Sequence, residues 1–164
     1  LRELHDLMKH GPTASNGCSA RITFVKSAEA KEKLRPAIRE SNVEQTMSAP
    51  VTAIIGWERE FFELLPRLFP RPGLNEVYRA DPERIERVGY LNATLQGAYF
   101  ILAARALGFD AGPVDGFENQ VVDQAFFQGT TVRSIFLCSI GHADLDHLPE
   151  PHPRLDFEEV CEII

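Results

Sequence analysis

The stretch His10–Arg21 reads HGPTASNGCSAR and separates two segments with different hydrophobic patterns. The segment before it, LRELHDLMK, repeats apolar residues at helical spacing, whereas the segment after it, RITFVK, alternates as a strand does. A plain turn needs about two to five residues, yet this stretch contains two glycines, a proline, an asparagine and four small hydroxyl or thiol side chains. It is therefore either a solvated loop or a loop whose backbone comes very close to another molecule.

Length and composition are those of a single soluble domain. The chain has 164 residues, of which 44% are hydrophobic and 25% charged, and we expect residues 1–164 to fold around one core. The formal net charge of −7 argues against nucleic acid or an anionic membrane as the main partner. No apolar run approaches the roughly 18–20 residues of a membrane span, and the chain shows no signal-peptide pattern.

The cysteines and the first residue add two expectations. Three cysteines at wide spacing, with no CxxC pair, suit a reducing compartment, so we expect the protein in the cytoplasm. The chain begins with Leu1 instead of Met, already inside a helical pattern, which indicates that an N-terminal segment is missing.

Periodicity, caps and breakers predict alternating helices and strands, hence an α+β or α/β fold in which helices predominate. No element is predicted for ESNVEQTMS (residues 40–48) or for FDAGPVDGFE (residues 109–118), and residues 58–78 are interpreted as a short helix followed by irregular structure. The predicted helices cover residues 1–8, 27–39 with a bend at Pro36, 81–107, 118–127 and 157–164, and the predicted strands cover residues 21–26, 49–57 and 132–140.

Most patterns that carry chemistry are absent or weak. The stretch HADLDHLPEPH (residues 142–152) holds three histidines and two aspartates, but it lies in a proline-containing loop, so a solvated loop is favoured over a metal site. Cys18 has no histidine placed beside it as a base, and Ser15 and Ser19 lack a G-x-S-x-G elbow. Glu58, Glu60 and Glu63 are interpreted as a solvated helix face. Neither a P-loop nor a G-x-G-x-x-G turn is present, which argues against those nucleotide sites.

Two loops of similar character remain, HGPTASNGCSAR and DAGPVDGFE. In the second, Gly112, Pro113 and Gly116 surround Val114 and Asp115. Glycines and small residues permit close backbone approach, and proline restricts the local shape. Together the loops could place backbone N–H and C=O groups against a flat polar ring, although each alone could be a tight connection.

The same segments resemble the nitroreductase family of flavoproteins. GPTASN (Gly11–Asn16) resembles the family's A/G-P-S/T-x-x-N loop, and Ala104–Gly108 with Pro113–Phe117 resembles its A-x-x-x-G-L/F and P-x-x-G-F/Y signatures, with Glu118 where the family has Asp. The likeness extends to PRLDFEEV near the C-terminus. It is greatest to the malonic semialdehyde reductases of pyrimidine (uracil) degradation, whose recurring motifs are similar to GPTASNGCSAR, SAPVTAIIGW, LFP and AFFQG here.

This resemblance implies a central mixed or antiparallel sheet flanked by helices, in an intertwined homodimer with FMN at the subunit interface. The small-residue face of the long helix (Ala93, Gly97, Ala103 and Ala104) is expected to suit packing against the same helix of the partner. The resemblance assigns cofactor contacts to Pro12, Thr13, Ala14, Ser15, Asn16, Asn42, Gln45, Pro113, Val114, Asp115, Gly116 and, at the phosphate, Arg154.

Each group has an implied role. Residues 12–16 would contact the flavin and its ribityl chain, and Asn42 would reach the ring edge. Gln45 would lie near N1–C2, where many members carry a lysine. Residues 113–116 would lie against the ring, with an N–H near Asp115 facing N5. The family's N-terminal arginine-rich phosphate motif lies outside this chain.

The implied activity is hydride transfer from NADH or NADPH through FMN to a small-molecule acceptor, in ping-pong order, with no catalytic side chain required. Malonic semialdehyde is the acceptor implied by the subfamily, and nitroaromatics and quinones are alternatives. A flavin-binding module without turnover is the competing interpretation, supported by Gln45 and by the missing N-terminal segment.

Overall fold

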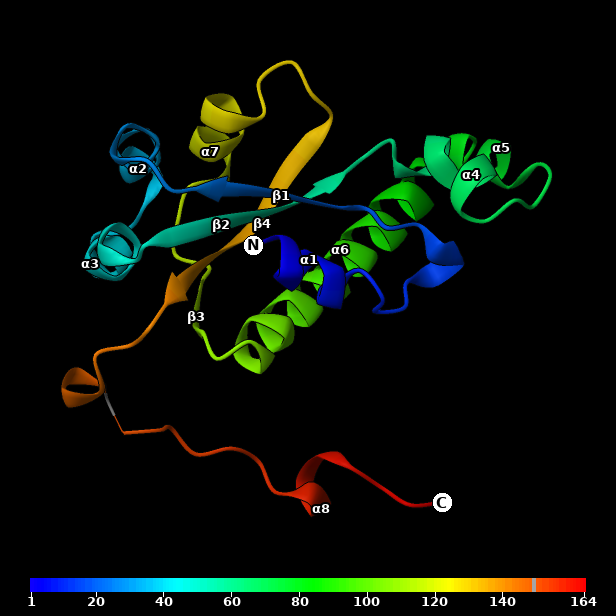
Figure 1. The fold of residues 1–164 in the computed structure, drawn as a ribbon. Helices are drawn as coiled ribbons and strands as arrows, with labels where there is room; N and C mark the ends of the chain where they lie inside the picture. The colour runs from blue at the N-terminus through cyan, green and yellow to red at the C-terminus, as the bar shows by residue number, and fades with distance from the viewer. Residues whose placement is uncertain (149) are drawn as a thin grey trace.

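A four-stranded antiparallel sheet forms the centre of the computed structural model, which describes residues 1–148 and 150–164 (Figure 1). The strand order is β1-β2-β4-β3. The two central strands are buried on both faces over most of their length, as their apolar runs predicted. The bounds are Ala20–Val25 for β1, Val51–Glu58 for β2, Asp110–Val114 for β3 and Val132–Gly141 for β4.

Helices cover both faces of this sheet. On one face, Val25, Ile54 and Leu137 pack with residues of α2 (Ala28–Leu34) and α7 (Asn119–Phe126). On the other face, Ile55 and Cys138 pack with α1 (Arg2–Met8) and α6 (Pro82–Ala106). The resulting three-layer arrangement confirms the α+β expectation. No helix within the described residues is long and apolar enough to cross a bilayer.

Local signals in the sequence determine where the main helices begin and end. The Ser27 side chain accepts a hydrogen bond from Ala30 N at 3.1 Å and begins α2. The Asp81 carboxylate accepts one from Arg84 N at 3.0 Å and begins α6, whose first helical residue is Pro82. Gly108 then takes the left-handed conformation (φ 82°) directly after α6.

Short helices between β2 and α6 build a separate apolar cluster. These are η3 (Phe61–Leu64), α4 (Leu65–Leu68) and α5 (Leu74–Arg79). The Phe61 and Tyr78 rings meet edge to face at 5.3 Å between centroids, and both are buried together with Val88 of α6. This segment is more regular than predicted, because its aromatic residues fold back onto the N-terminal half of α6.

Three expectations about secondary structure are wrong. Residues 110–114, expected in a loop, form β3, which tolerates Pro113 because β3 lies at the edge of the sheet and pairs only with β4. Residues 40–48 form the helix α3 (Glu40–Ser48), although their pattern is almost entirely polar. The last helix, α8, spans only Phe157–Val160, and Cys161 returns to extended backbone because residues 157–164 are all exposed and contact no core.

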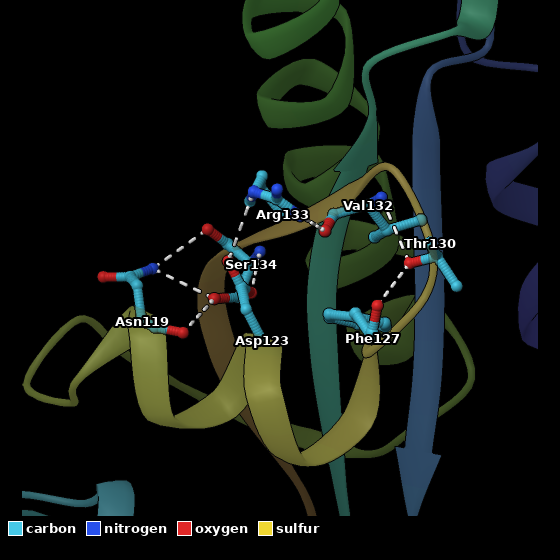
Figure 2. A network of polar contacts seen from close by, with 7 residues as sticks. All are labelled: Asn119, Asp123, Phe127, Thr130, Val132, Arg133 and Ser134. Atoms are coloured by element: carbon cyan, nitrogen blue, oxygen red, sulfur yellow. Dashed lines mark hydrogen bonds and ion pairs between the residues drawn. The ribbon is translucent and has the colours of Figure 1, made fainter.

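The helix α7 covers an edge of β4 that β3 leaves free. The pairing of β3 with β4 ends at Val114 and Leu137, so Ser134 lies beyond it. The carboxylate of Asp123 accepts a hydrogen bond from Ser134 N at 2.8 Å, and Asn119 Nδ2 donates to Ser134 O at 2.9 Å (Figure 2). Two side chains one turn apart on α7 thus bind the backbone N–H and C=O of Ser134, which no neighbouring strand reaches on this side of β4 in the described residues.

Candidate functional site

Asn42 and Gln45 lie on α3, where this helix meets the chain leaving β3. The Asn42 Nδ2 atom donates to the carbonyl oxygen of Gly116 at 3.2 Å, and the backbone N–H of Arg39 donates to the same oxygen at 3.0 Å. Asn42 is half-buried and Gln45 is exposed. The structure therefore brings together Asn42, Gln45 and the Gly112–Gly116 segment, which are about seventy residues apart in the sequence.

The two glycines in this segment make room for those two amides. A Cβ atom at Gly116 would lie 2.1 Å from Asn42 Nδ2, and one at Gly112 would lie 2.2 Å from Gln45 Nε2. The φ of Gly116 is not positive, so the glycine is needed for space and not for an unusual backbone conformation. The expectation was that glycine would let the backbone approach a ring, but the space beside each glycine is filled by an amide side chain of this chain.

A buried lysine holds the end of α3. Lys31 Nζ donates to the carbonyl oxygen of Thr46 at 2.5 Å and to Thr52 Oγ1 of β2 at 2.7 Å. Thr46 lies in the last turn of α3, where carbonyls lack helical partners and a positive charge is favourable. Burial lowers the pKa of Lys31 from its ordinary value. Lys31 thereby fastens α3 to the sheet one residue after Gln45.

The second group of predicted residues, Pro12–Asn16, forms a loop with an unusual backbone. It contains a single 3₁₀ turn, η1 (Ala14–Asn16). Ser15 and Asn16 have φ values of 54° and 48°, and Cys18 follows with 41°. Left-handed backbone is uncommon for residues other than glycine and persists only where the surrounding structure enforces it.

One face of α6 provides that enforcement. Its buried Asn92 accepts a hydrogen bond from Ala14 N at 2.8 Å and donates one to Ala14 O at 3.2 Å. Tyr99 OH donates to Pro12 O at 2.9 Å, and Gln96 Oε1 accepts from Ala20 N at 2.9 Å. Residues 92, 96 and 99 share one face of the helix, so a single stripe of polar side chains binds the loop at Pro12 and Ala14 and binds the start of β1 at Ala20.

Other contacts close the loop at its ends. Asn16 Nδ2 donates to the carbonyl oxygen of Leu68 at 2.8 Å, so this predicted cofactor residue already has a partner within the chain. Ser19 is buried, and its hydroxyl donates to the carbonyl oxygen of Gly89 at 2.6 Å. Pro12 and Ala14 remain exposed, which leaves the outer side of the loop available to a ligand.

The third predicted position, Arg154, lies on an extended C-terminal arm. The arm leaves the body of the molecule after β4 and carries α8 (Figure 1). Arg154 is exposed, and its guanidinium donates to the carbonyl oxygens of His152 and Pro153 at 2.7 and 3.2 Å. Its assignment to a phosphate stays a prediction.

The predicted cofactor residues thus occur in three groups that one chain does not bring together. Figure 1 places α3 and the end of β3 on one side of the molecule, and the loop after α1 on the other. Within the described part of the chain, the hydrogen bonds of residues 12–16 are to one another, to the following Gly17 and Cys18, to α6 or to α4, and none is to α3 or β3. The contacts of one chain therefore leave the loop at residues 12–16 and the α3–β3 region as two separate surfaces.

Asn92, Gln96 and Tyr99 are residues that the sequence interpretation missed. The sequence analysis gave these three residues no role, yet Asn92 and Gln96 are buried. Their signal was available, because polar side chains at positions i, i+4 and i+7 of an otherwise apolar helix mark a polar stripe.

The structure gives little support to the other candidate sites, which are the histidine-rich stretch, Cys18 and a groove beside α1. Among residues 1–148 and 150–164, no three histidine, cysteine or acidic side chains gather as metal ligands, and residue 149 of the stretch 142–152 is outside the described residues. Cys18 Sγ lies 3.4 Å from Asn16 Oδ1 and 3.9 Å from Thr13 Oγ1, and neither is a base for a thiol. A groove of about 580 Å³ between α1 and β1 contains none of the predicted cofactor residues.

The chain belongs to the nitroreductase family, whose profile matches residues 1–142. A protein of Cupriavidus pinatubonensis, provisionally named an NADH dehydrogenase/NAD(P)H nitroreductase, is 50% identical over 99% of this chain and 85% of its own length.

Solved structures confirm the fold. A provisionally assigned nitroreductase of Exiguobacterium sibiricum, in complex with FMN, superposes with a TM-score of 0.83 at 18% identity, over 99% of this chain and 85% of its own. A nitroreductase family protein of Streptococcus pneumoniae superposes with a TM-score of 0.84 at 22% identity, over 99% and 88%. At these identities the structures support the architecture alone.

Proposed function

We propose that this chain is an FMN-dependent NAD(P)H oxidoreductase that works as a homodimer with two shared sites. The observation that carries the proposal is the separation of the predicted residues into two surfaces, one on α3 and β3 and one on the loop Pro12–Asn16. Each surface exposes amide or backbone groups. The names of the Cupriavidus relative and of the FMN-bound Exiguobacterium protein support the cofactor and the hydride donor.

The residues present fit a flavin in type and in size. Asn42 and Gln45 offer carboxamides, which can donate to and accept from the polar edge of a ring, and Pro12, Thr13, Ala14 and Ser15 have small side chains that leave their backbone accessible. FMN, when bound, supplies hydride acceptance and donation. The chain's residues then need only to bind and orient the ring and the two substrates, which agrees with the lack of a convincing acid–base pair.

The dimer is supported by two apolar surfaces that are exposed in the described part of one chain. The outer face of α6 exposes Leu91 (50%), Leu95 (37%) and Leu102 (66%) at intervals of four and seven residues. The C-terminal arm exposes Leu155, Phe157, Val160, Ile163 and Ile164. Exposed apolar surface of this extent is typical of an interaction site, and we propose that the arm of each subunit wraps the other.

The small-residue face of α6, which was expected to contact the partner, is occupied within the chain itself. The small-residue face, with Ala93, Gly97 and Ala104, packs on the chain's own sheet, and a Cβ at Gly97 would lie 2.6 Å from the Phe136 ring. Small residues here let α6 approach β2 and β4 closely. The leucines on the opposite face are therefore the proposed contact with the partner.

Subunit complementation tests the shared site. One variant carries Asn42→Ala with Gln45→Ala, and the other carries Ser15→Trp, which blocks the loop surface. If each site draws one surface from each subunit, a heterodimer purified with two different tags regains one intact site and about half of the parent's FMN. Equal loss of FMN in the heterodimer and in both homodimers would refute the shared site.

The proposed acceptor is malonic semialdehyde, reduced with NAD(P)H and a proton to 3-hydroxypropionate and NAD(P)⁺. The similarity of SAPVTAIIGW, LFP and AFFQG to the malonic semialdehyde reductases supports it. A general nitro or quinone reductase is the alternative, favoured by the name of the Cupriavidus relative. Anaerobic reduction of the holoprotein by NADH and by NADPH, followed by reoxidation with each acceptor, compares them. Bound FMN that neither nucleotide reduces would indicate a module without turnover.

A further inference from the structure

We propose that Asn92 is a positioning residue that holds the cofactor loop in its left-handed conformation from the buried side. This inference rests on the proposed function, because it concerns the loop Pro12–Asn16 of that same site. Asn92 itself faces away from any ligand on the outer side of the loop. It acts through the backbone of Ala14 and the two residues that follow.

The geometry supports a two-point clamp. Both hydrogen-bonding groups of the Asn92 carboxamide are used on one residue: Oδ1 accepts from Ala14 N at 2.8 Å and Nδ2 donates to Ala14 O at 3.2 Å. A carboxamide that pairs with the N–H and C=O of the same residue constrains the orientation of the two peptide units on either side of that residue. Asn92 is fully buried, so its carboxamide has no access to solvent, whereas Ala14 lies on the exposed side of both bonds.

The clamp acts where the backbone is least favourable. Ala14 directly precedes Ser15 and Asn16, whose φ values are 54° and 48°. Left-handed backbone at two successive residues other than glycine is costly and needs external support. Only Tyr99, through Pro12 O, and Asn16, through Leu68 O, add further long-range bonds to this loop among the described residues.

Gln96 provides a matched control on the same helix face. It is also buried, it also accepts a hydrogen bond from a backbone N–H (Ala20, 2.9 Å), and its position is one turn along α6. Its backbone partner, however, is the first residue of β1, outside the loop. Leucine at either position removes side-chain hydrogen bonds to the backbone, two at Asn92 and one at Gln96, and only the change at Asn92 removes them from the loop.

The experiment compares Asn92→Leu with Gln96→Leu and Asn92→Asp with Gln96→Glu in the full chain. Amide hydrogen exchange without flavin should show faster exchange at Ala14 and residues 16–18 only in the Asn92 variants. FMN titration should show at least a tenfold higher Kd for the Asn92 variants, together with a changed circular dichroism spectrum of bound flavin. The Gln96 variants should stay within about twofold of the parent in Kd, at a similar loss of melting temperature.

Two results would overturn the assignment. One is unchanged FMN affinity in Asn92→Leu despite faster exchange in the loop, because the conformation of the loop would then be irrelevant to binding. The other is a loss of FMN that follows melting temperature equally in the Asn92 and Gln96 variants, which would indicate a general structural role. If Asn92→Leu does not fold, the isosteric Asn92→Asp decides, since it keeps the acceptor and loses the donor. A parent that exchanges as expected but binds no FMN would refute the proposed function and leave the clamp intact.

Discussion

Gly116→Ala is the change whose consequence the structure defines most sharply. The new Cβ would lie 2.1 Å from Asn42 Nδ2, and contacts below 3.0 Å essentially do not occur, so the amide must move by about 1 Å or more. That movement breaks the 3.2 Å hydrogen bond from Asn42 Nδ2 to Gly116 O. Because the displaced group is the end of a flexible side chain, the backbone can stay in place.

The expected magnitudes follow from two opposing terms. A lost hydrogen bond costs about 0.5–1.5 kcal/mol, and replacing glycine by alanine at a compatible φ recovers about 0.4–1 kcal/mol through the unfolded state. The free energy of unfolding should therefore change by less than about 1 kcal/mol. If Asn42 contacts FMN as proposed, its displacement should raise the Kd for FMN about two- to tenfold, which corresponds to one hydrogen bond.

A double-mutant cycle with Asn42→Ala isolates this mechanism. If Gly116→Ala acts through the amide, the double variant should bind FMN about as Asn42→Ala does, since there is no amide left to displace. Gly112→Ala with Gln45→Ala gives a parallel cycle, because a Cβ there would lie 2.2 Å from Gln45 Nε2. Strictly additive losses of FMN affinity in the Gly116 and Asn42 variants would refute the reasoning.

Three other predictions concern the arm, a buried cation and a buried thiol. Arg154→Ala should weaken FMN roughly ten- to a hundredfold if the guanidinium pairs with the phosphate, and an unchanged Kd in equilibrium dialysis would end that assignment. Burial lowers the pKa of Lys31 from 10.5 in the folded state, so between the lowered pKa and 10.5 the unfolded state binds more protons than the folded state. The free energy of unfolding therefore rises with pH in that window. Denaturant titrations at pH 8 and 10 should show this contribution in the parent and its loss in Lys31→Met; equal pH dependence in both would contradict it. Burial raises the pKa of the Cys138 thiol to about 11, so iodoacetamide at pH 8 should modify Cys138 only after unfolding, as peptide mass spectrometry would detect, and modification of the native protein would show that the thiol is accessible.

Much of the fold was predictable because its signals are local. Ser27 and Asp81 act through hydrogen bonds to residues three positions later, and the apolar centre of β2 needs only its own composition to indicate burial. The family could be recognised for a related reason, since its loop and helix-end motifs are short and occur in order along the chain.

The missed elements depend on contacts between distant segments. The polar run of α3 becomes a helix whose last turn is held by Lys31, and β3 becomes a strand only because β4 offers it an edge. Lys31 and β4 both lie outside the segments whose own hydrophobic pattern was used to predict their structure. The prediction of a longer last helix fails for the opposite reason, since the apolar residues of α8 stay exposed among the residues that the structure describes.

The sequence by itself predicted which residues would contact a cofactor, because its short motifs resemble those of a known family one position at a time. Only the tertiary structure decided how they are grouped: Asn42 with Gly116, the loop Pro12–Asn16 on the polar face of α6, and Arg154 on an exposed arm. It also decided that the small residues of α6 face the sheet and its leucines face outward. The physical reason is that a helix's apolar residues specify that it is buried, whereas the shapes of the surfaces it meets decide which face is buried against which neighbour.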